Sequence, residues 1–161
     1  MLLPPARIAL DRLTAPYAAL LLRLTLGIVF IAHGLFKMLV LTLPHTATFF
    51  VAHGFPGWAA YPVFAAEVFG GAALVAGYYT RVIAIALLPV LIGAFTVHWP
   101  NGWYFGNPHG GWEYIAVLLA ALLVQAGLGD GAFSLGTVAP NARAVADSQG
   151  SSARDRLAGT R

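Results

Sequence analysis

The sequence predicts an all-α integral membrane protein, a bundle of four transmembrane helices with both termini in the cytoplasm. Composition predicts the class: of 161 residues, 59% are hydrophobic and only 9% are charged, whereas a soluble domain carries about a quarter charged residues. Hydropathy patterning predicts the helices, because several apolar runs approach or exceed the length that crosses a bilayer. The net charge of +3 does not indicate a nucleic-acid partner, since the Arg residues are not clustered on one face.

The chain divides into a short lead-in, one membrane domain and a tail. Residues 1–17 are amphipathic and predict a cytoplasmic segment at the interface. The membrane domain covers 18–130, and its third span contains Pro89, which predicts a kink. The connection 44–58 is apolar enough to predict a half-buried or re-entrant segment, and the tail 131–161 predicts disorder. The four expected spans are 18–43, 59–79, 82–99 and 112–128.

Lys and Arg placement predicts the orientation. The loops 44–58 and 100–111 contain neither residue, whereas Arg7, Arg12, Arg81 and Arg143 fall together on the other side. Because cytoplasmic loops carry the excess of basic residues, both termini are expected inside. Aromatic side chains at the opposite face predict an interfacial belt. Its members are Trp58, Trp99, Trp103, Tyr104, Trp112 and Tyr114.

The first span carries three ionisable residues on one stripe. At about 100° per residue, Arg23, His33 and Lys37 fall within an arc of about 120°, and the rest of the surface is mainly Leu, Ile, Val and Ala. An ionisable group in hydrocarbon is costly, so this stripe should face the bundle interior or a wet cavity. The stripe contains basic groups but no acidic one, so an acidic partner is expected on another helix.

Glu67, the only charged residue of the second span, is the expected partner. At about 1.5 Å per residue, His33 and Glu67 both lie roughly 12 Å below the outer surface, and Lys37 roughly 6 Å. Lys37 or a protonated His33 would keep the carboxylate ionised, and the three groups could pass protons. An ion pair that only stabilises the fold is the alternative. Small residues on the Glu67 face favour an interior position; they are Gly70, Gly71 and Gly77.

Further candidates border this cluster. His98, Trp99 and Glu113 lie at the outer ends of spans three and four and would line a cofactor's entrance. Arg23 lies apart, toward the cytoplasmic end, and either contacts a cofactor or anchors near the headgroups. The outer histidines match no metal-ligand spacing, so no metal site is predicted.

The order of these residues resembles the DoxX family of small bacterial and archaeal four-helix membrane proteins. The resemblance covers roughly 18–130 and extends more distantly to the DoxD subunit of thiosulfate:quinone oxidoreductase. It implies an oxidoreductase-like role in the membrane, contact with quinones and, in some members, a complex with soluble redox partners. The thiol-redox relatives use a Cys pair, which this chain lacks. The matching positions are Arg23, Gly27, His33-Gly34, Lys37, Gly54-Phe55-Pro56, Glu67, Gly70-Gly71, Gly77 and Arg81.

We therefore expect a quinone-associated component of a membrane oxidoreductase in the bacterial inner membrane. Glu67 and His33 would exchange protons with the quinone head, and Lys37 would tune Glu67. Electrons would come from a soluble redox protein or another membrane subunit. Two alternatives remain open: a non-enzymatic anchor or assembly partner for a redox protein, and a pathway for protons or a small solute.

Overall fold

The structure is a computed structural model that describes residues 5–136, with side chains described from residue 13 onward. Every regular element in this part of the chain is helical, which confirms the all-α class. Three helical stretches are long and apolar enough to cross a membrane, and a fourth apolar helix is shorter. They are Leu13–Leu39, Gly57–Ala76, Thr80–Asn101 and the shorter Glu113–Leu128.

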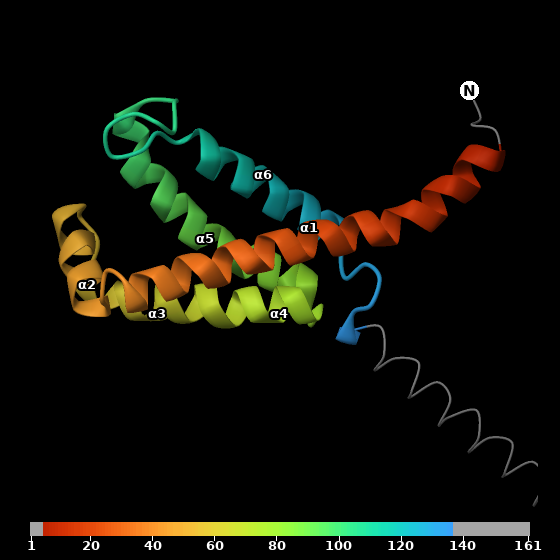
Figure 1. The fold of residues 1–161 in the computed structure, drawn as a ribbon, viewed down its shortest axis with the longest axis horizontal. Helices are drawn as coiled ribbons and strands as arrows, with labels where there is room; N and C mark the ends of the chain where they lie inside the picture. The colour runs from red at the N-terminus through yellow and green to blue at the C-terminus, as the bar shows by residue number, and fades with distance from the viewer. Residues whose placement is uncertain (1–4, 137–161) are drawn as a thin grey trace, which may run out of the picture.

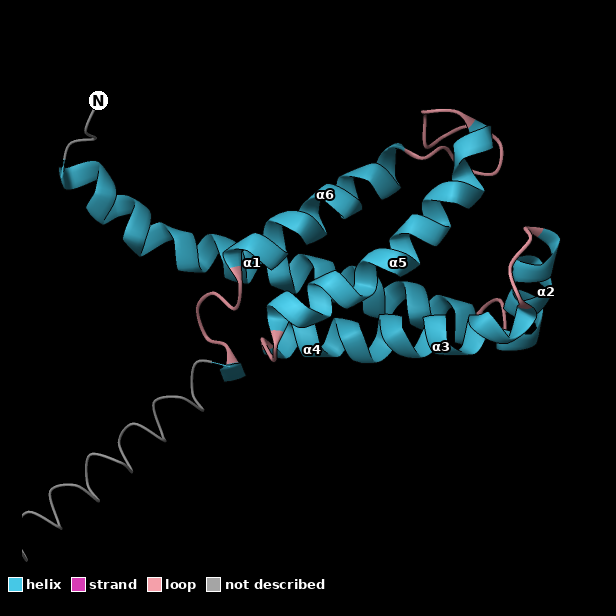
Figure 2. Ribbon diagram, turned by 180° about the vertical axis from the view of Figure 1, so that it is seen from behind, coloured by secondary structure: helices cyan, strands magenta, loops and turns pink. Residues whose placement is uncertain are grey.

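The helices form two hairpins that cross (Figure 1). Helix α1 (Pro5–Leu39) pairs with the second span, which is divided into a 3-10 turn η1 (Gly57–Ala59), α3 (Ala60–Ala65), a π-helical turn η2 (Ala66–Gly70) and α4 (Gly71–Ala76). Helix α5 (Thr80–His98), extended by a 3-10 turn η3 (Trp99–Asn101), pairs with α6 (Glu113–Leu128). The hairpins lie close where α4 turns into α5 and diverge toward the other end, which we call the α2 end (Figure 2).

Helix α1 is longer than the predicted first span. The amphipathic lead-in is not a separate segment from residue 5 onward, because it forms the first turns of α1. Pro16 lies inside the helix, and Figure 1 shows α1 curving toward its N-terminal end. Proline removes one helical hydrogen bond, which accounts for a bend at this point.

The predicted half-buried connection 44–58 contains a helix of its own, α2 (Leu43–Ala52). Thr42 caps it, since its hydroxyl accepts a hydrogen bond from the His45 amide at 3.4 Å. Figure 1 shows α2 standing across the end of the α1 hairpin. Thr46 is the buried residue of α2, so this segment lies on the bundle end and does not enter it.

The two spans of the first hairpin approach each other at glycines. A Cβ added to Gly27 would lie 2.7 Å from the Gly71 carbonyl oxygen, and one added to Gly71 would lie 2.7 Å from that of Gly27. Backbones come this close in lipid only where both helices present small residues. The expectation that the Gly71 face points into the bundle is confirmed.

The apolar core fills the space where the two hairpins cross. Its side chains come from α1, α4, α5 and α6, and helix α5 continues through Pro89 to His98. Many large apolar side chains point outward instead, as a chain surrounded by lipid requires. The core residues are Leu26, Phe30, Leu74, Ala84, Leu87, Leu91, Ile115, Leu118 and Leu122.

Candidate functional site

Lys37 and Glu67 form an ion pair between α1 and the second span. The Lys37 ammonium donates to both carboxylate oxygens of Glu67, at 2.5 and 2.7 Å. The side chain of Glu67 is 6% exposed and that of Lys37 is 20% exposed. Of the two partners predicted for Glu67, Lys37 and His33, the structure places only Lys37 in contact with it. Removing either partner of so little exposed an ion pair would destabilise the fold, because the other charge would stay buried without a partner.

Glu67 belongs to the π-helical turn η2, Ala66–Gly70. Such a turn inserts one extra residue into a helix and often occurs at functional sites. Opposite it, a Cβ added to Gly34 would lie 2.6 Å from Cγ2 of Val68 and 3.2 Å from Cβ of Glu67. The absence of a side chain at Gly34 therefore lets η2 lie directly on α1, one helical turn before Lys37.

His33 lies at this level but is turned away from the ion pair. Its imidazole is exposed, and Nδ1 lies 2.8 Å from the Val29 carbonyl oxygen, so that Nδ1–H donates. Within the described residues, no hydrogen bond or ion pair joins His33 to Glu67. The ring instead stacks against Tyr114 of the second hairpin, with ring centroids 6.3 Å apart. His33 of the first hairpin therefore contacts the second hairpin.

The three candidates for the outer entrance lie beside an aromatic cluster. His98 Nδ1 bonds to the Ala94 carbonyl oxygen at 2.8 Å, and the ring is half-buried. Trp99 stacks on Trp112 at 5.0 Å between centroids. Glu113 begins α6, and its backbone amide donates to the Trp103 carbonyl oxygen. These residues line the 99–112 connection, on the second hairpin.

Arg23 lies at the opposite end of the stripe, about 21 Å along α1 from Lys37 at 1.5 Å per residue. It is 1% exposed, and Nη2 donates to the carbonyl oxygens of Ala132 and Phe133 at 3.2 and 3.4 Å. The structure thus separates Arg23 from the other candidates and brings it to the segment that follows α6.

A model of the DoxX family matches residues 18–99. The chain belongs to the DoxX family. A relative from Bacillus subtilis (strain 168), named "Putative oxidoreductase CatD", is 32% identical over 108 residues, which cover 67% of this chain and 78% of that protein. No solved structure matches the chain.

The DoxX positions predicted from sequence fall into two groups in space. His33, Lys37 and Glu67 lie in the half of the bundle toward the α2 end. Arg23 and Gly77 lie in the other half, where the guanidinium occupies the place that a Cβ at residue 77 would need. Arg81 is exposed there and packs against Gly129.

Sequence reasoning missed three buried polar residues of the described chain. Thr80, Gln125 and Ser134 are at most 2% exposed. Gln125 is the one that a sequence signal could have found, because it is the single polar residue between Ile115 and Leu128 of α6. Its Nε2 donates to the Gly129 carbonyl oxygen at 2.7 Å. In the described part of the chain, no three His, Cys, Asp or Glu side chains gather as metal ligands.

Proposed function

We propose that this DoxX protein is a quinone-associated component of a membrane oxidoreductase. The observation that carries the proposal is the little-exposed Lys37–Glu67 ion pair, placed by a π-helical turn in an apolar bundle beside His33. Ionisable groups inside a membrane bundle are expensive and typically mark a ligand or proton site. The name of the Bacillus subtilis relative, an oxidoreductase, points to the same class of chemistry.

His33 is the proposed contact with the quinone head. Nδ1–H is held by the Val29 carbonyl, so a neutral imidazole presents the Nε2 lone pair and a protonated one presents a second N–H. Nε2 can accept a proton from a quinol hydroxyl or donate one to a reduced quinone oxygen. Tyr114 adds an aromatic surface on the second hairpin, on which a flat ring can pack.

The Lys37–Glu67 pair, one helical turn along α1 from His33 but not hydrogen-bonded to it, is the proposed proton reserve. Converting quinone to quinol takes two electrons and two protons; His33 delivers protons, and a redox partner delivers electrons. The chain contains no Cys, so it has no dithiol of its own for this purpose. His98, Trp99 and Glu113 would border the entrance from the outer surface.

The proposal includes an orientation and a location. With both termini in the cytoplasm of a bacterium, the α2 end of the bundle faces outward in the inner membrane, and the basic residues lie inside. The electron donor is then a soluble redox protein or another membrane subunit.

A photoreactive quinone analogue tests the proposal. We expect it to label peptides containing His33 or Tyr114 in purified protein in lipid nanodiscs, and excess natural quinone to suppress the labelling. Phe substituted for His33 should reduce labelling at least fivefold, whereas His45→Phe, on the exposed face of α2, should leave it unchanged. Equal labelling of the two variants would contradict the proposal.

The anchor alternative has its own support, since the ion pair joins two tightly packed helices and could serve the fold alone. The exchanged pair K37E/E67K separates the two. A purely structural pair tolerates the exchange, whereas a proton reserve placed near His33 does not. Quinone-linked turnover that persists in the exchanged variant would therefore favour the anchor, and proton flux into liposomes that Glu67→Gln abolishes would favour a proton pathway.

A further inference from the structure

The segment after α6 does not leave the bundle at once. Residues 129–136, which we call the strap, fold back across the end of the molecule opposite α2 (Figure 2). The Ala132 amide donates to the Pro16 carbonyl oxygen at 2.9 Å, and the Gly136 amide donates to the Gly77 carbonyl oxygen at 3.0 Å. The sequence assigned 131–136 to the tail, but in the structure these residues contact α1 and the α4–α5 turn.

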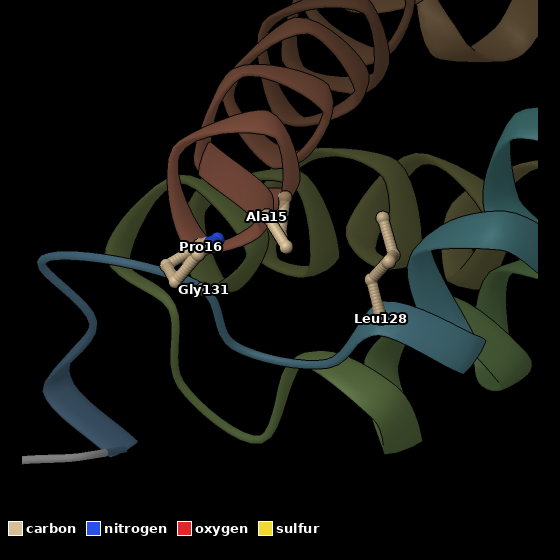
Figure 3. A pocket seen from close by; sticks show the side chains of 5 residues that line it. Ala15, Pro16, Leu128 and Gly131 are labelled. Atoms are coloured by element: carbon tan, nitrogen blue, oxygen red, sulfur yellow. The ribbon is translucent and has the colours of Figure 1, made fainter. Parts of the chain in front are cut away.

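The strap meets α1 at Pro16, which lies inside the helix. Its carbonyl oxygen accepts a hydrogen bond from the Ala132 amide at the point where α1 bends. Figure 3 shows Gly131 of the strap beside Pro16, at one wall of a pocket of about 360 Å³. A Cβ added to Gly131 would lie 2.8 Å from the Pro16 oxygen and 2.9 Å from Cβ of Ala19. The strap therefore fits closely against α1.

The strap also caps α5. Asp130 Oδ1 accepts a hydrogen bond from the Thr80 amide at 3.1 Å, at the first turn of α5. Tyr79, the residue before the helix, provides no side-chain cap. A carboxylate at a helix N-terminus satisfies a free amide and is favoured by the helix dipole. The strap thus connects the C-terminal end of α6 to two other places. One is the beginning of the apolar part of α1, and the other is the N-terminus of α5.

Arg23 is the buried charge that faces the strap. Its guanidinium binds two successive strap carbonyls, of Ala132 and Phe133, and Asp130 attracts it electrostatically. A cation buried to this extent requires such partners. The strap supplies the two carbonyls that Nη2 binds, whereas Nε and Nη1 have no hydrogen-bond partner within the described residues. The guanidinium lies so close to Gly77 that no side chain fits at residue 77.

We infer that the strap is a clasp that fastens the two hairpins together at this end, and that Arg23 closes it. The hairpins are tied here and diverge at the α2 end, so the clasp is the fixed point of the bundle. The inference concerns Arg23 and the strap alone and does not depend on the quinone proposal.

The absence of Cys allows a direct test on the full chain in nanodiscs. Ser134→Cys reports on the strap and Thr46→Cys reports on the α2 end; both positions are 2% exposed in the native chain. We expect slow maleimide labelling of both. Adding Arg23→Met should accelerate labelling of S134C at least tenfold and that of T46C less than twofold. Thr25→Met, at an exposed position of α1 two residues from Arg23, should change neither rate.

An unchanged labelling rate of S134C in the Arg23→Met background would overturn the inference. If both reporters accelerate, Gly136→Val decides, because its side chain would meet Asp130 and the Gly77 carbonyl without altering α1. Acceleration of S134C alone in that background supports the clasp. Equal acceleration of both reporters, or of neither, overturns it.

Discussion

The two halves of α1 hold buried charge in different ways. Toward the α2 end, Lys37 meets Glu67, an opposite charge carried by the paired helix. Toward the strap, Arg23 meets mainly backbone carbonyls from a segment more than 100 residues away in the chain. The first arrangement keeps two titratable groups together and partly accessible, whereas the second encloses one permanent cation. The proposed proton exchange concerns the first half, and the inferred clasp concerns the second.

The largest effect is expected at Gly77, where the strap half tolerates no side chain. Gly77→Ala places a Cβ on the Arg23 guanidinium and forces alanine to a φ of +69°. We expect a loss of about 3 kcal/mol or more, seen as a collapse of the yield of monodisperse protein. Gly127→Ala is the matched control, since nothing lies within 4 Å of its Cβ. A normal yield for Gly77→Ala would show that Arg23 is not fixed where the structure places it.

Breaking the ion pair should come next. Lys37→Met leaves the Glu67 carboxylate buried without a partner, which costs about 3 kcal/mol. The double variant K37M/E67L should recover most of that loss, because no charge remains to be buried. The stabilities of both variants are compared by their thermal unfolding midpoints in the same detergent. A double variant as unstable as the single one would mean that packing, not charge, governs this half.

A smaller loss of stability is expected from a substitution at Gly27, where the two halves of α1 meet. Gly27→Ala would bring a Cβ within 2.6 Å of Cγ2 of Val75 and force α1 and α4 apart. Overpacking of this kind costs about 1–3 kcal/mol. Gly93→Ala in α5 should be nearly neutral, since its closest neighbour is the Phe55 ring at 3.9 Å. Equal unfolding midpoints for the two variants would argue against the close helix contact.

The smallest effect concerns the cap that the strap provides. Asp130→Ala removes the acceptor of the Thr80 amide, and a lost cap costs about 1 kcal/mol. Asp130→Asn keeps an acceptor oxygen and should lose less. Hydrogen exchange at the Thr80 amide reports the difference, with faster exchange expected in the alanine variant. Exchange that is the same in both variants would show that Asp130 does not cap α5.

Much of the fold could be predicted because the hydropathy of the sequence identifies long apolar helices. The Lys37–Glu67 contact was predicted only as one of two alternatives, because helical rise places His33, not Lys37, at the depth of Glu67. The side-chain direction of His33 could not be predicted, because it depends on the Val29 carbonyl and on Tyr114. Nor could the π-helical turn, since nothing in the sequence of 66–70 distinguishes it from ordinary helix. The contacts of the strap with the bundle were not predicted, because its small and polar residues have the composition of an exposed tail.

The length of α6 has a consequence for the surrounding lipid. Its 16 residues rise about 24 Å, less than the roughly 30 Å of a bilayer's hydrocarbon layer, while α1 beside it has ample length. Acyl chains next to α6 must shorten, or the Trp-rich connection and the strap must occupy the missing few ångströms at its ends. Where the acyl chains shorten, the bilayer is thinner beside α6 than beside α1, and the bundle would then respond to membrane thickness on that flank.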